Sequence, residues 1–284
     1  MSATPKSAGA GAGGFADLGP RVISALVMVA AALAALYLGG DVFASFWIVA
    51  GFAINWEWQG LIGGARRRWR VAAGGVAVAA AAAFGQTGLV GPAALSLGVL
   101  AFVAALLAGP ERRLWAAAGV FYAGAPIFSV CWLRQSPDHG LLAIAFLFAI
   151  VWGTDVFAYF GGRLIGGPKL WPRVSAGKTW SGTITGVVSG AALGLATAWF
   201  GGGPALAGGK TFLVALLAAA VSQMGDLAES SVKRRFGVKD SSRIIPGHGG
   251  VMDRLDGFIF ASILAAAISV VGGKPSAADN LFLW

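Results

Sequence analysis

The sequence predicts an all-α protein, a polytopic integral membrane bundle of about nine transmembrane helices, and composition and patterning carry this prediction. Of 284 residues, 57% are hydrophobic and only 12% are charged, with a mean hydropathy of +0.76. A soluble domain carries about 25% charged residues, so this chain has too little polar surface to cover a globule. Its high hydrophobicity excludes a disordered chain, and its single cysteine, Cys131, excludes a disulfide-stapled secreted domain.

The apolar residues fall into stretches that are each long enough, or nearly so, to cross about 30 Å of hydrocarbon as a helix. The first stretch is too long, and its flank too weakly basic, to favour the alternative of a cleaved signal peptide. The third is short and rich in alanine, and could form a helical hairpin with the fourth. The nine stretches cover 21–39, 43–62, 71–86, 89–108, 115–132, 140–161, 181–200, 211–229 and 252–272.

The placement of cationic residues predicts the topology. If the N-terminus is cytoplasmic, only Arg134, Lys210 and Lys274 fall outside the cytoplasmic segments, and the other 18 of the 21 Lys and Arg residues lie within them. The positive-inside rule predicts this asymmetry, and nine spans then place the C-terminus in the periplasm. The net charge of +9 does not indicate nucleic-acid binding, because the cations flank membrane spans.

Three regions follow from this topology. Residues 1–19 are rich in Gly, Ala and Ser and are predicted to be a flexible tail. Residues 20–135 form the N-terminal transmembrane helices. Residues 136–284 form the C-terminal catalytic region, with cytoplasmic loops at 162–180 and 230–250. The compact chain and its Ala-, Gly- and Arg-rich composition favour a bacterial inner membrane.

Acidic residues at the ends of the predicted spans indicate a functional site, because ionisable groups are expensive in a membrane. Asp226 and Glu229 are three residues apart, as are Asp253 and Asp256, so each pair shares one face of a helix. Both pairs lie at the cytoplasmic ends of the eighth and ninth spans. Such oxygen ligands suit Mg²⁺, Mn²⁺ or Ca²⁺. An ion-pair network with neighbouring cations is the alternative.

Two further acidic residues have open roles. Asp155, near the cytoplasmic end of the sixth span, either joins this site or pairs with Arg163. Glu57, between two tryptophans, is either a buried structural partner or a member of the site.

The two cytoplasmic loops combine cations with glycines and small hydroxyl groups, as polyphosphate binding requires. Residues 177–179, Gly-Lys-Thr, look like the end of a P-loop, but the upstream glycine spacing is wrong. These loops and the carboxylates predict a cationic pocket ready for Mg²⁺ and suited to phosphoryl-type transfer. It would open sideways to lipid, which favours a phospholipid substrate. The cations and hydroxyls are Arg163, Lys169, Arg173, Ser175, Lys178, Thr179, Lys233, Arg234, Arg235, Lys239 and Arg243.

The loop before the ninth span, together with the start of that span, resembles the signature of the phosphatidate cytidylyltransferase family. The resemblance is continuous over the 27 residues of 230–256 and extends upstream to 225–230 and to parts of 155–179. Ala176 and Ser181 depart from the family pattern, which usually has proline and glutamate there. The matching positions are Asp155, Tyr159, Gly162, Arg163, Lys169, Leu170, Pro172, Ser175, Lys178, Thr179, Gly225, Asp226, Leu227, Ala228, Glu229, Ser230, Lys233, Arg234, Lys239, Asp240, Ser242, Ile245, Pro246, His248, Gly249, Gly250, Asp253, Arg254, Leu255 and Asp256.

The resemblance implies that CTP and phosphatidate react to form CDP-diacylglycerol and pyrophosphate. It implies that Asp226, Asp253 and Asp256 hold Mg²⁺, with K⁺ as a candidate second cation, and homodimers fit family habit. It also implies that Lys239 and His248 belong to the catalytic set, His248 positioning phosphate without abstracting a proton, because a phosphate monoester is already anionic near neutral pH. The implied substrate-binding residues are Lys233, Arg234, Arg243, Gly249, Gly250, Arg254, Arg163, Ser175, Lys178 and Thr179.

Other functions fit the sequence less well. A kinase or cytidylyltransferase acting on an isoprenoid or another lipid alcohol would use a similar pocket. A cation-coupled transporter would need ionisable groups near the membrane midplane and broken helices, whereas these acids cluster at helix ends. A scaffold protein would not need four acids facing a cationic loop.

Overall fold

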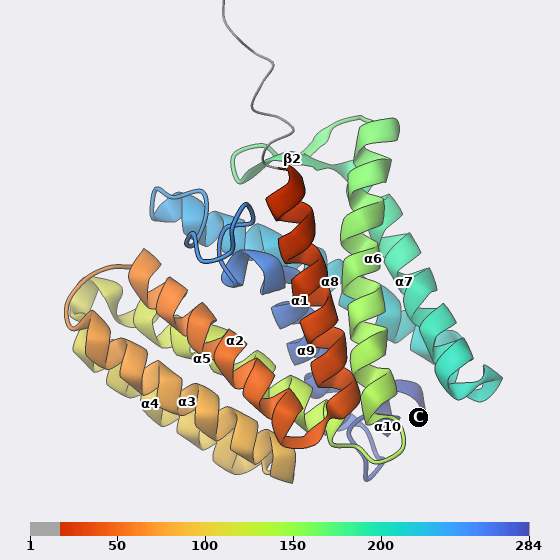
Figure 1. Ribbon diagram of the computed structural model, residues 1–284, viewed down its shortest axis with the longest axis horizontal. Helices are drawn as coiled ribbons and strands as arrows, with labels where there is room; N and C mark the ends of the chain where they lie inside the picture. Colours follow the sequence, from red (N-terminus) through yellow and green to blue (C-terminus); the bar gives the residue numbers. More distant parts are fainter. Residues whose placement is uncertain (1–17, 284) are drawn as a thin grey trace, which may run out of the picture.

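The computed structural model describes residues 18–283, and within them it shows nine long helices and one short β-hairpin (Figure 1). Residues 1–17 of the predicted tail lie outside the described residues. The elements are α1 (Leu18–Leu38), α2 (Gly40–Leu61), α3 (Arg67–Thr87), α4 (Val90–Ala108), α5 (Arg113–Arg134), α6 (Gly140–Leu164), β1 (Lys169–Trp171), β2 (Ser175–Thr179), α7 (Trp180–Gly202), α8 (Gly209–Arg235), α9 (Met252–Val271) and the short α10 (Asp279–Phe282), with 3₁₀ turns at Pro110–Arg112 and Pro204–Leu206.

Every apolar stretch predicted from the sequence corresponds to a helix, and the protein is a multi-pass helical membrane protein. Six of the described helices are long and apolar enough to cross a membrane: Val90–Ala108, Pro110–Arg134, Gly140–Leu164, Trp180–Gly202, Gly209–Arg235 and Met252–Val271. The apolar part of α1, Val22–Leu38, is shorter, and α2 and α3 are not among the six. The count of nine spans and the orientation of the termini therefore stay predictions.

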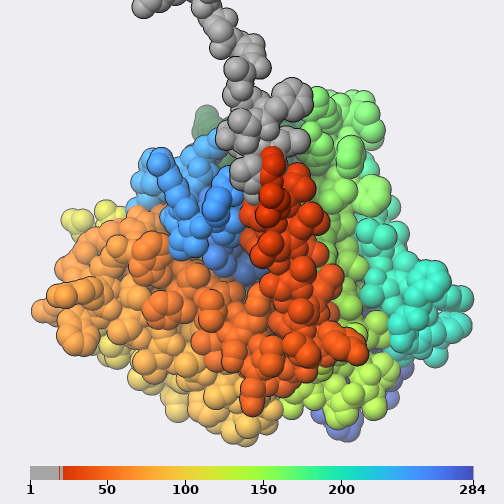
Figure 2. Space-filling view, in the orientation of Figure 1, coloured from red at the N-terminus to blue at the C-terminus, as the bar shows by residue number. Residues whose placement is uncertain are grey.

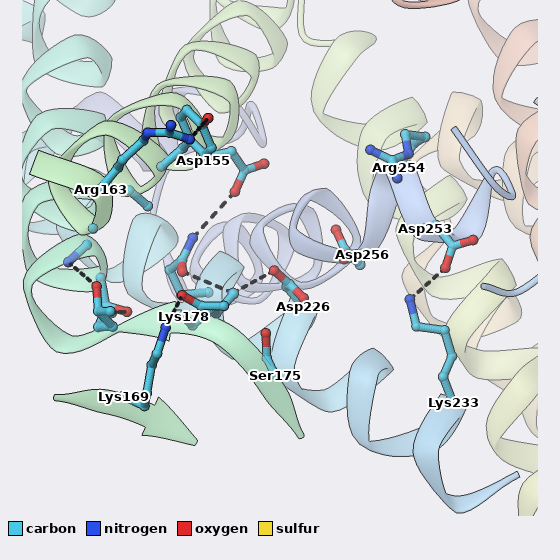
Figure 3. Close-up of a pocket in the computed structure, with 18 of the residues that line it drawn as sticks. Asp155, Arg163, Lys169, Ser175, Lys178, Asp226, Lys233, Asp253, Arg254 and Asp256 are labelled. Atoms are coloured by element: carbon cyan, nitrogen blue, oxygen red, sulfur yellow. Dashed lines mark hydrogen bonds and ion pairs between the residues drawn. The ribbon is translucent and has the colours of Figure 1, made fainter. Parts of the chain in front are cut away.

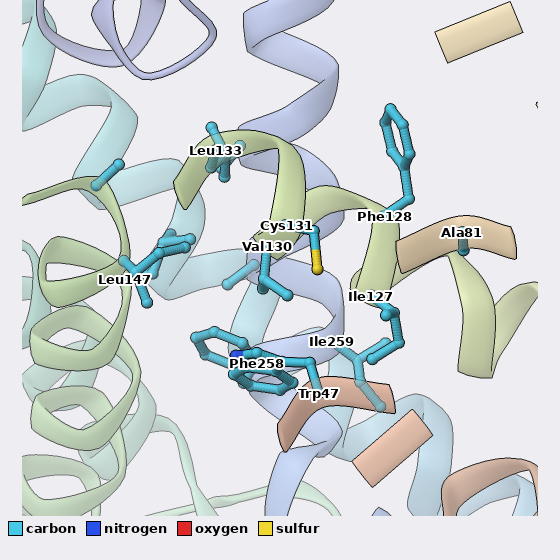
Figure 4. Close-up of a cluster of buried hydrophobic side chains, with 14 of the residues drawn as sticks. Trp47, Ala81, Ile127, Phe128, Val130, Cys131, Leu133, Leu147, Phe258 and Ile259 are labelled. Carbon is cyan, nitrogen blue, oxygen red and sulfur yellow. The ribbon is translucent and has the colours of Figure 1, made fainter. Parts of the chain in front are cut away.

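The helices form two lateral groups around a central pair. Figure 1 shows α2, α3, α4 and α5 on one side, α6 and α7 on the other, and α8 and α9 between them. Side chains from several of these helices meet in a shared core (Figure 4). There Trp47 of α2 stacks on Phe258 of α9, with ring centroids 5.1 Å apart, and Phe148 of α6 lies 5.2 Å from Phe258. This core fixes α9 against both halves of the chain.

Glycines bring α6 and α7 into close contact. Gly182, Gly186, Gly190 and Gly194 recur every four residues, so they share the face of α7 that packs on α6. A Cβ atom at Gly186 would lie 2.5 Å from the backbone oxygen of Thr154. Small residues at such spacing let helix backbones approach closely in a membrane, where van der Waals packing drives association.

The β-hairpin caps the end of the α6–α7 pair. Its strands are antiparallel, with Lys169 opposite Thr179 and Trp171 opposite Ser175. Thr179 also caps α7, since its hydroxyl accepts a hydrogen bond from the backbone N–H of Gly182 at 3.1 Å. The hairpin was not predicted from the sequence, and it adds a small strand pair to the expected all-α bundle.

We expect Gly186→Val to lower the stability of the protein in detergent, because the new side chain would collide with the backbone of α6. Overpacking of this kind costs about 1–3 kcal/mol. Gly98→Val is the matched control, since a Cβ atom at Gly98 of α4 would meet no other atom within 4 Å. Equal thermal midpoints for the two variants would contradict the close packing of α6 and α7.

Candidate active site

A cavity of about 720 Å³ opens among the hairpin, α6, α7, α8 and α9 (Figure 3). Polar and charged side chains from these elements point into it, with apolar helix surface behind them. Acidic and basic groups therefore face each other across a space large enough for a small phosphorylated ligand. The lining residues are Asp155, Ala158, Tyr159, Gly162, Arg163, Lys169, Ser175, Gly177, Lys178, Thr179, Gly182, Thr183, Gln223, Asp226, Lys233, Asp240, Asp253, Arg254 and Asp256.

Three carboxylates of the cavity wall come from three different helices. Asp226 of α8 pairs with the Lys178 ammonium of β2 at 2.6 Å. Asp155 of α6 accepts a hydrogen bond of 3.4 Å from the Gln223 side-chain amide, and Asp256 of α9 accepts one of 2.7 Å from the backbone N–H of Gly257. Within residues 18–283, no ion pair reaches Asp155 or Asp256. This wall therefore carries more negative than positive charge.

The carboxylate of Asp253 is held differently. It pairs with the Lys233 ammonium at 2.6 Å through one oxygen. Its other oxygen accepts hydrogen bonds from the Ser241 backbone N–H at 2.9 Å, the Ser241 hydroxyl at 2.8 Å and the Gly250 backbone N–H at 2.8 Å. Asp253 thus closes the loop between α8 and α9 onto the first turn of α9.

A buried ionic network lies behind Asp253. Lys233 also pairs with Glu229, one turn earlier on α8, at 2.9 Å. The hydroxyl of Tyr122, from α5, donates to the other oxygen of Glu229 at 3.1 Å. The network therefore links α5, α8 and α9, and the ion-pair alternative considered for these acids is realised for Glu229 and Asp253.

The residues predicted for the site divide into two groups. Those that line the cavity are Asp226, Asp253, Asp256, Lys233, Arg254, Arg163, Ser175, Lys178 and Thr179. Those that do not are Lys239, His248, Arg234, Arg243, Gly249 and Gly250, all of them in the loop between α8 and α9 or at the end of α8.

The loop between α8 and α9 contacts the N-terminal half of the chain. His248 Nδ1 lies 2.8 Å from the hydroxyl of Ser24 in α1, and that hydroxyl also donates to the Pro246 carbonyl at 3.3 Å. Figure 2 shows the segment containing this loop (blue) against α1 (red). His248 therefore contacts α1 and lies outside the cavity lining.

Some lining residues were not assigned to the site from the sequence. Gln223 lies three residues before Asp226 on the same helix and bonds both Lys178, at 3.1 Å, and Asp155. Its helical spacing from Asp226 was the available signal. Asp240, next to Lys239 in the signature, also lines the cavity.

The donor chemistry of the wall suits a hard divalent cation. No group of three His, Cys, Asp or Glu side chains is already gathered as a metal site in the described part of the chain. Asp155, Asp226 and Asp256 nevertheless face one cavity, and among the described residues two of them lack a cationic partner. Carboxylate oxygens are the ligands that Mg²⁺ prefers, usually together with substrate phosphates.

A membrane-helix bundle with carboxylates and cations facing one cavity is typical of an enzyme that transfers phosphoryl-type groups. The chain matches the model of the cytidylyltransferase family over residues 19–271. It is 40% identical over 280 residues to the phosphatidate cytidylyltransferase of Brucella abortus (strain 2308), covering 94% of this chain and 99% of that protein. It is 37% identical over 271 residues to the phosphatidate cytidylyltransferase of Pseudomonas aeruginosa, covering 87% and 97%.

The chain therefore belongs to the phosphatidate cytidylyltransferase family, which confirms the resemblance found in the signature. It is an enzyme, a nucleotidyltransferase.

We expect Lys178→Met to lower kcat/KM by about 10- to 100-fold, because a charge-assisted contact contributes roughly 1.5–3 kcal/mol. Lys178 is the cation placed on the carboxylate wall and pairs with Asp226. Lys274→Met, an exposed lysine outside the cavity lining, is the control. Unchanged kinetics in Lys178→Met would exclude a role for this cation in substrate binding.

Lys233→Met is expected to destabilise the fold strongly, since it leaves Glu229 and Asp253 without their shared cation. Removing one partner of a buried ion pair costs about 3–5 kcal/mol. The measurement is the thermal midpoint in detergent, with the exposed neighbour Lys239→Met as the matched control. Equal midpoints would show that the network contributes little.

Proposed function

We propose that the protein transfers the cytidylyl group of CTP to phosphatidate, forming CDP-diacylglycerol and pyrophosphate. The observation that carries this proposal is the cavity wall of three carboxylates beside Lys178, at one end of a membrane-helix bundle. The relatives named phosphatidate cytidylyltransferase support the same reaction over nearly the whole chain. A lipid substrate fits a cavity built from helices that lie in the membrane.

The reaction needs positioning more than acid–base chemistry. A phosphate oxygen of phosphatidate attacks the α-phosphorus of CTP, and the bond from that phosphorus to the bridging oxygen breaks. The electron pair leaves with pyrophosphate. The attacking group is already anionic near neutral pH, because the second pKa of a phosphate monoester is about 6. No side chain has to remove a proton, which agrees with the position of His248 outside the cavity lining.

Mg²⁺ is the proposed cofactor, with Asp226 and Asp256 as its ligands and Asp155 on the same wall. A bound divalent cation supplies positive charge to the attacking and leaving oxygens. Asp253, the third ligand implied by the family signature, would have to exchange one of its present donors for the metal. K⁺ remains a proposed second cation.

The cations that line the cavity would bind the phosphates. Lys178, which pairs with Asp226 in this structure, would bind a phosphate oxygen of the substrate. Arg163 and Lys169 reach the cavity from α6 and β1, and Arg254 reaches it from α9. The hairpin holds Lys178 and Lys169 on adjacent strands, so both can grip one polyphosphate.

We also propose that the cavity faces the cytoplasm and that the protein resides in a bacterial inner membrane. The loops at both sides of the cavity carry most of the cations of the C-terminal half, as cytoplasmic loops do. CTP is a cytoplasmic nucleotide, so this orientation supplies the substrate directly.

The test is a turnover assay on the detergent-purified protein, with CTP labelled at its α-phosphate, phosphatidate and Mg²⁺. Label is expected to enter the lipid phase only when phosphatidate and metal are both present, and EDTA is expected to stop it. Asp256→Asn should lower the rate by about 100-fold or more, as the loss of one preorganised electrostatic group does. Asp138→Asn, an exposed acid outside the cavity, is the matched control.

Two outcomes would contradict the proposal. Transfer of label to a polyprenol but not to phosphatidate would identify a lipid-alcohol enzyme. Full activity in EDTA would exclude the metal.

A further inference from the structure

Glu57 of α2 reaches the loop that precedes α9, almost two hundred residues later in the chain. Its side chain is buried, with 1% of the residue exposed. Its carboxylate accepts hydrogen bonds from the backbone N–H groups of Val251 at 2.9 Å and Met252 at 2.7 Å. It also accepts from the Ser242 hydroxyl at 2.7 Å, and the Ser241 hydroxyl, which lies closer to Asp253, is 3.2 Å away.

The two backbone N–H groups and the Ser242 hydroxyl take the place of a cationic partner. In the part of the chain that the structure describes, no Lys, Arg or His lies within ion-pair distance of Glu57. A buried carboxylate without partners is very costly, so the hydrogen bonds are what allow it to stay there. The N–H groups at the start of α9 also carry the positive end of that helix dipole. Glu57 and the folded loop therefore stabilise each other.

Glu57 and Asp253 hold the same loop from two sides. The Ser241 hydroxyl contacts both carboxylates, at 3.2 Å and 2.8 Å. Gly250 donates its N–H to Asp253, and a Cβ atom at Gly250 would lie 2.5 Å from Glu57 Oε1. Glycine at position 250 therefore leaves the room that the Glu57 carboxylate and the Ser241 hydroxyl occupy. Together the two carboxylates fix residues 241–252.

The rest of α2 is anchored independently of Glu57. Trp58 donates to the Trp115 carbonyl at 2.8 Å, and Gln59 donates to the Ala116 carbonyl at 3.1 Å. Trp47 stacks in the core against α9. Loss of the Glu57 carboxylate should therefore leave the helix in place and remove one of the two carboxylates that hold the loop.

We infer that Glu57 is a positioning residue for the transfer reaction: it clamps residues 241–252 so that the first turn of α9 presents Asp253, Arg254 and Asp256 to the cavity. The inference rests on the proposed function. Glu57 does not line the cavity, so it acts on the substrate only through the loop and through α9.

Glu57→Gln tests the inference at nearly constant volume. Glutamine has one acceptor oxygen and turns an NH₂ group toward donors, so part of the clamp is lost. We expect kcat to fall by about 10- to 100-fold, because a displacement of about 1 Å at a reacting centre has this effect. Asp41→Asn, an exposed acid at the other end of α2, is the matched control and should keep wild-type kinetics.

The rate of tryptic cleavage measures how firmly the loop is held and does not depend on enzyme activity. Arg243 is an exposed residue of the clamped loop, and the exposed Lys239 lies just before it. The rate of cleavage after these residues is measured in detergent, below the thermal midpoint of each variant, and followed by mass spectrometry. This rate should be several-fold higher in Glu57→Gln than in wild type or Asp41→Asn. CTP with Mg²⁺ and phosphatidate should slow it.

A double-mutant cycle of Glu57→Gln with Ser242→Ala tests whether the effect on kcat arises from the loop, because the Ser242 hydroxyl donates a hydrogen bond to Glu57. If the carboxylate acts through the loop, Ser242→Ala should lower kcat in the wild-type background and change it little in Glu57→Gln. Additive effects would overturn the inference. So would Glu57→Gln with wild-type kcat and tryptic rates and only a lower thermal midpoint.

The two hypotheses fail in different ways. A wild-type protein without transfer to phosphatidate contradicts the proposed function. Unchanged tryptic cleavage in Glu57→Gln contradicts the clamp, whatever the activity.

Discussion

The structure depends on the hydrogen bonds and ion pairs that its buried carboxylates make. Glu57 is satisfied by backbone and hydroxyl donors, and Asp253 by Lys233 and the loop before α9. Glu229 shares Lys233 and the hydroxyl of Tyr122. Asp155 and Asp256 have no cationic partner among the described residues. The carboxylates of Glu57, Asp253 and Glu229 hold the loop and the helices around the site together. The carboxylates of Asp155 and Asp256, which lack a cationic partner, give the cavity the negative charge that a divalent cation would offset.

Close helix packing gives the site its rigid frame. The glycine face of α7 holds it against α6, so that Asp155 and Arg163 on α6 lie beside the hairpin that precedes α7. The aromatic stack of Trp47 and Phe258 holds α9 to the N-terminal half. A site whose members come from α6, the hairpin, α8 and α9 needs both contacts, since neither lateral group alone completes the cavity.

Much of this arrangement could be predicted from the sequence. Hydropathy placed every long helix, and Asp226, Asp253 and Asp256, predicted at the ends of two spans, all line the cavity, whereas Glu229, predicted on the same face as Asp226, lies in the buried network instead. The hairpin was missed because strands of three and five residues give no periodic signal, and its pairing depends on the packing of α6 and α7. The role of Glu57 could not be assigned from its neighbours, because its partners lie almost two hundred residues away. The family resemblance predicted His248 as a site member, but its contact with Ser24 depends on tertiary packing that the sequence does not show.

The central claim is that the wall formed by Asp155, Asp226 and Asp256 holds a divalent cation, and Mn²⁺ binding followed by electron paramagnetic resonance tests it most directly. The purified protein should remove Mn²⁺ from the free pool, and Asp226→Asn and Asp256→Asn should weaken this binding by about tenfold or more, which is about 1.4 kcal/mol. Asp138→Asn should bind as wild type does. Equal Mn²⁺ binding by all four proteins would contradict the claim.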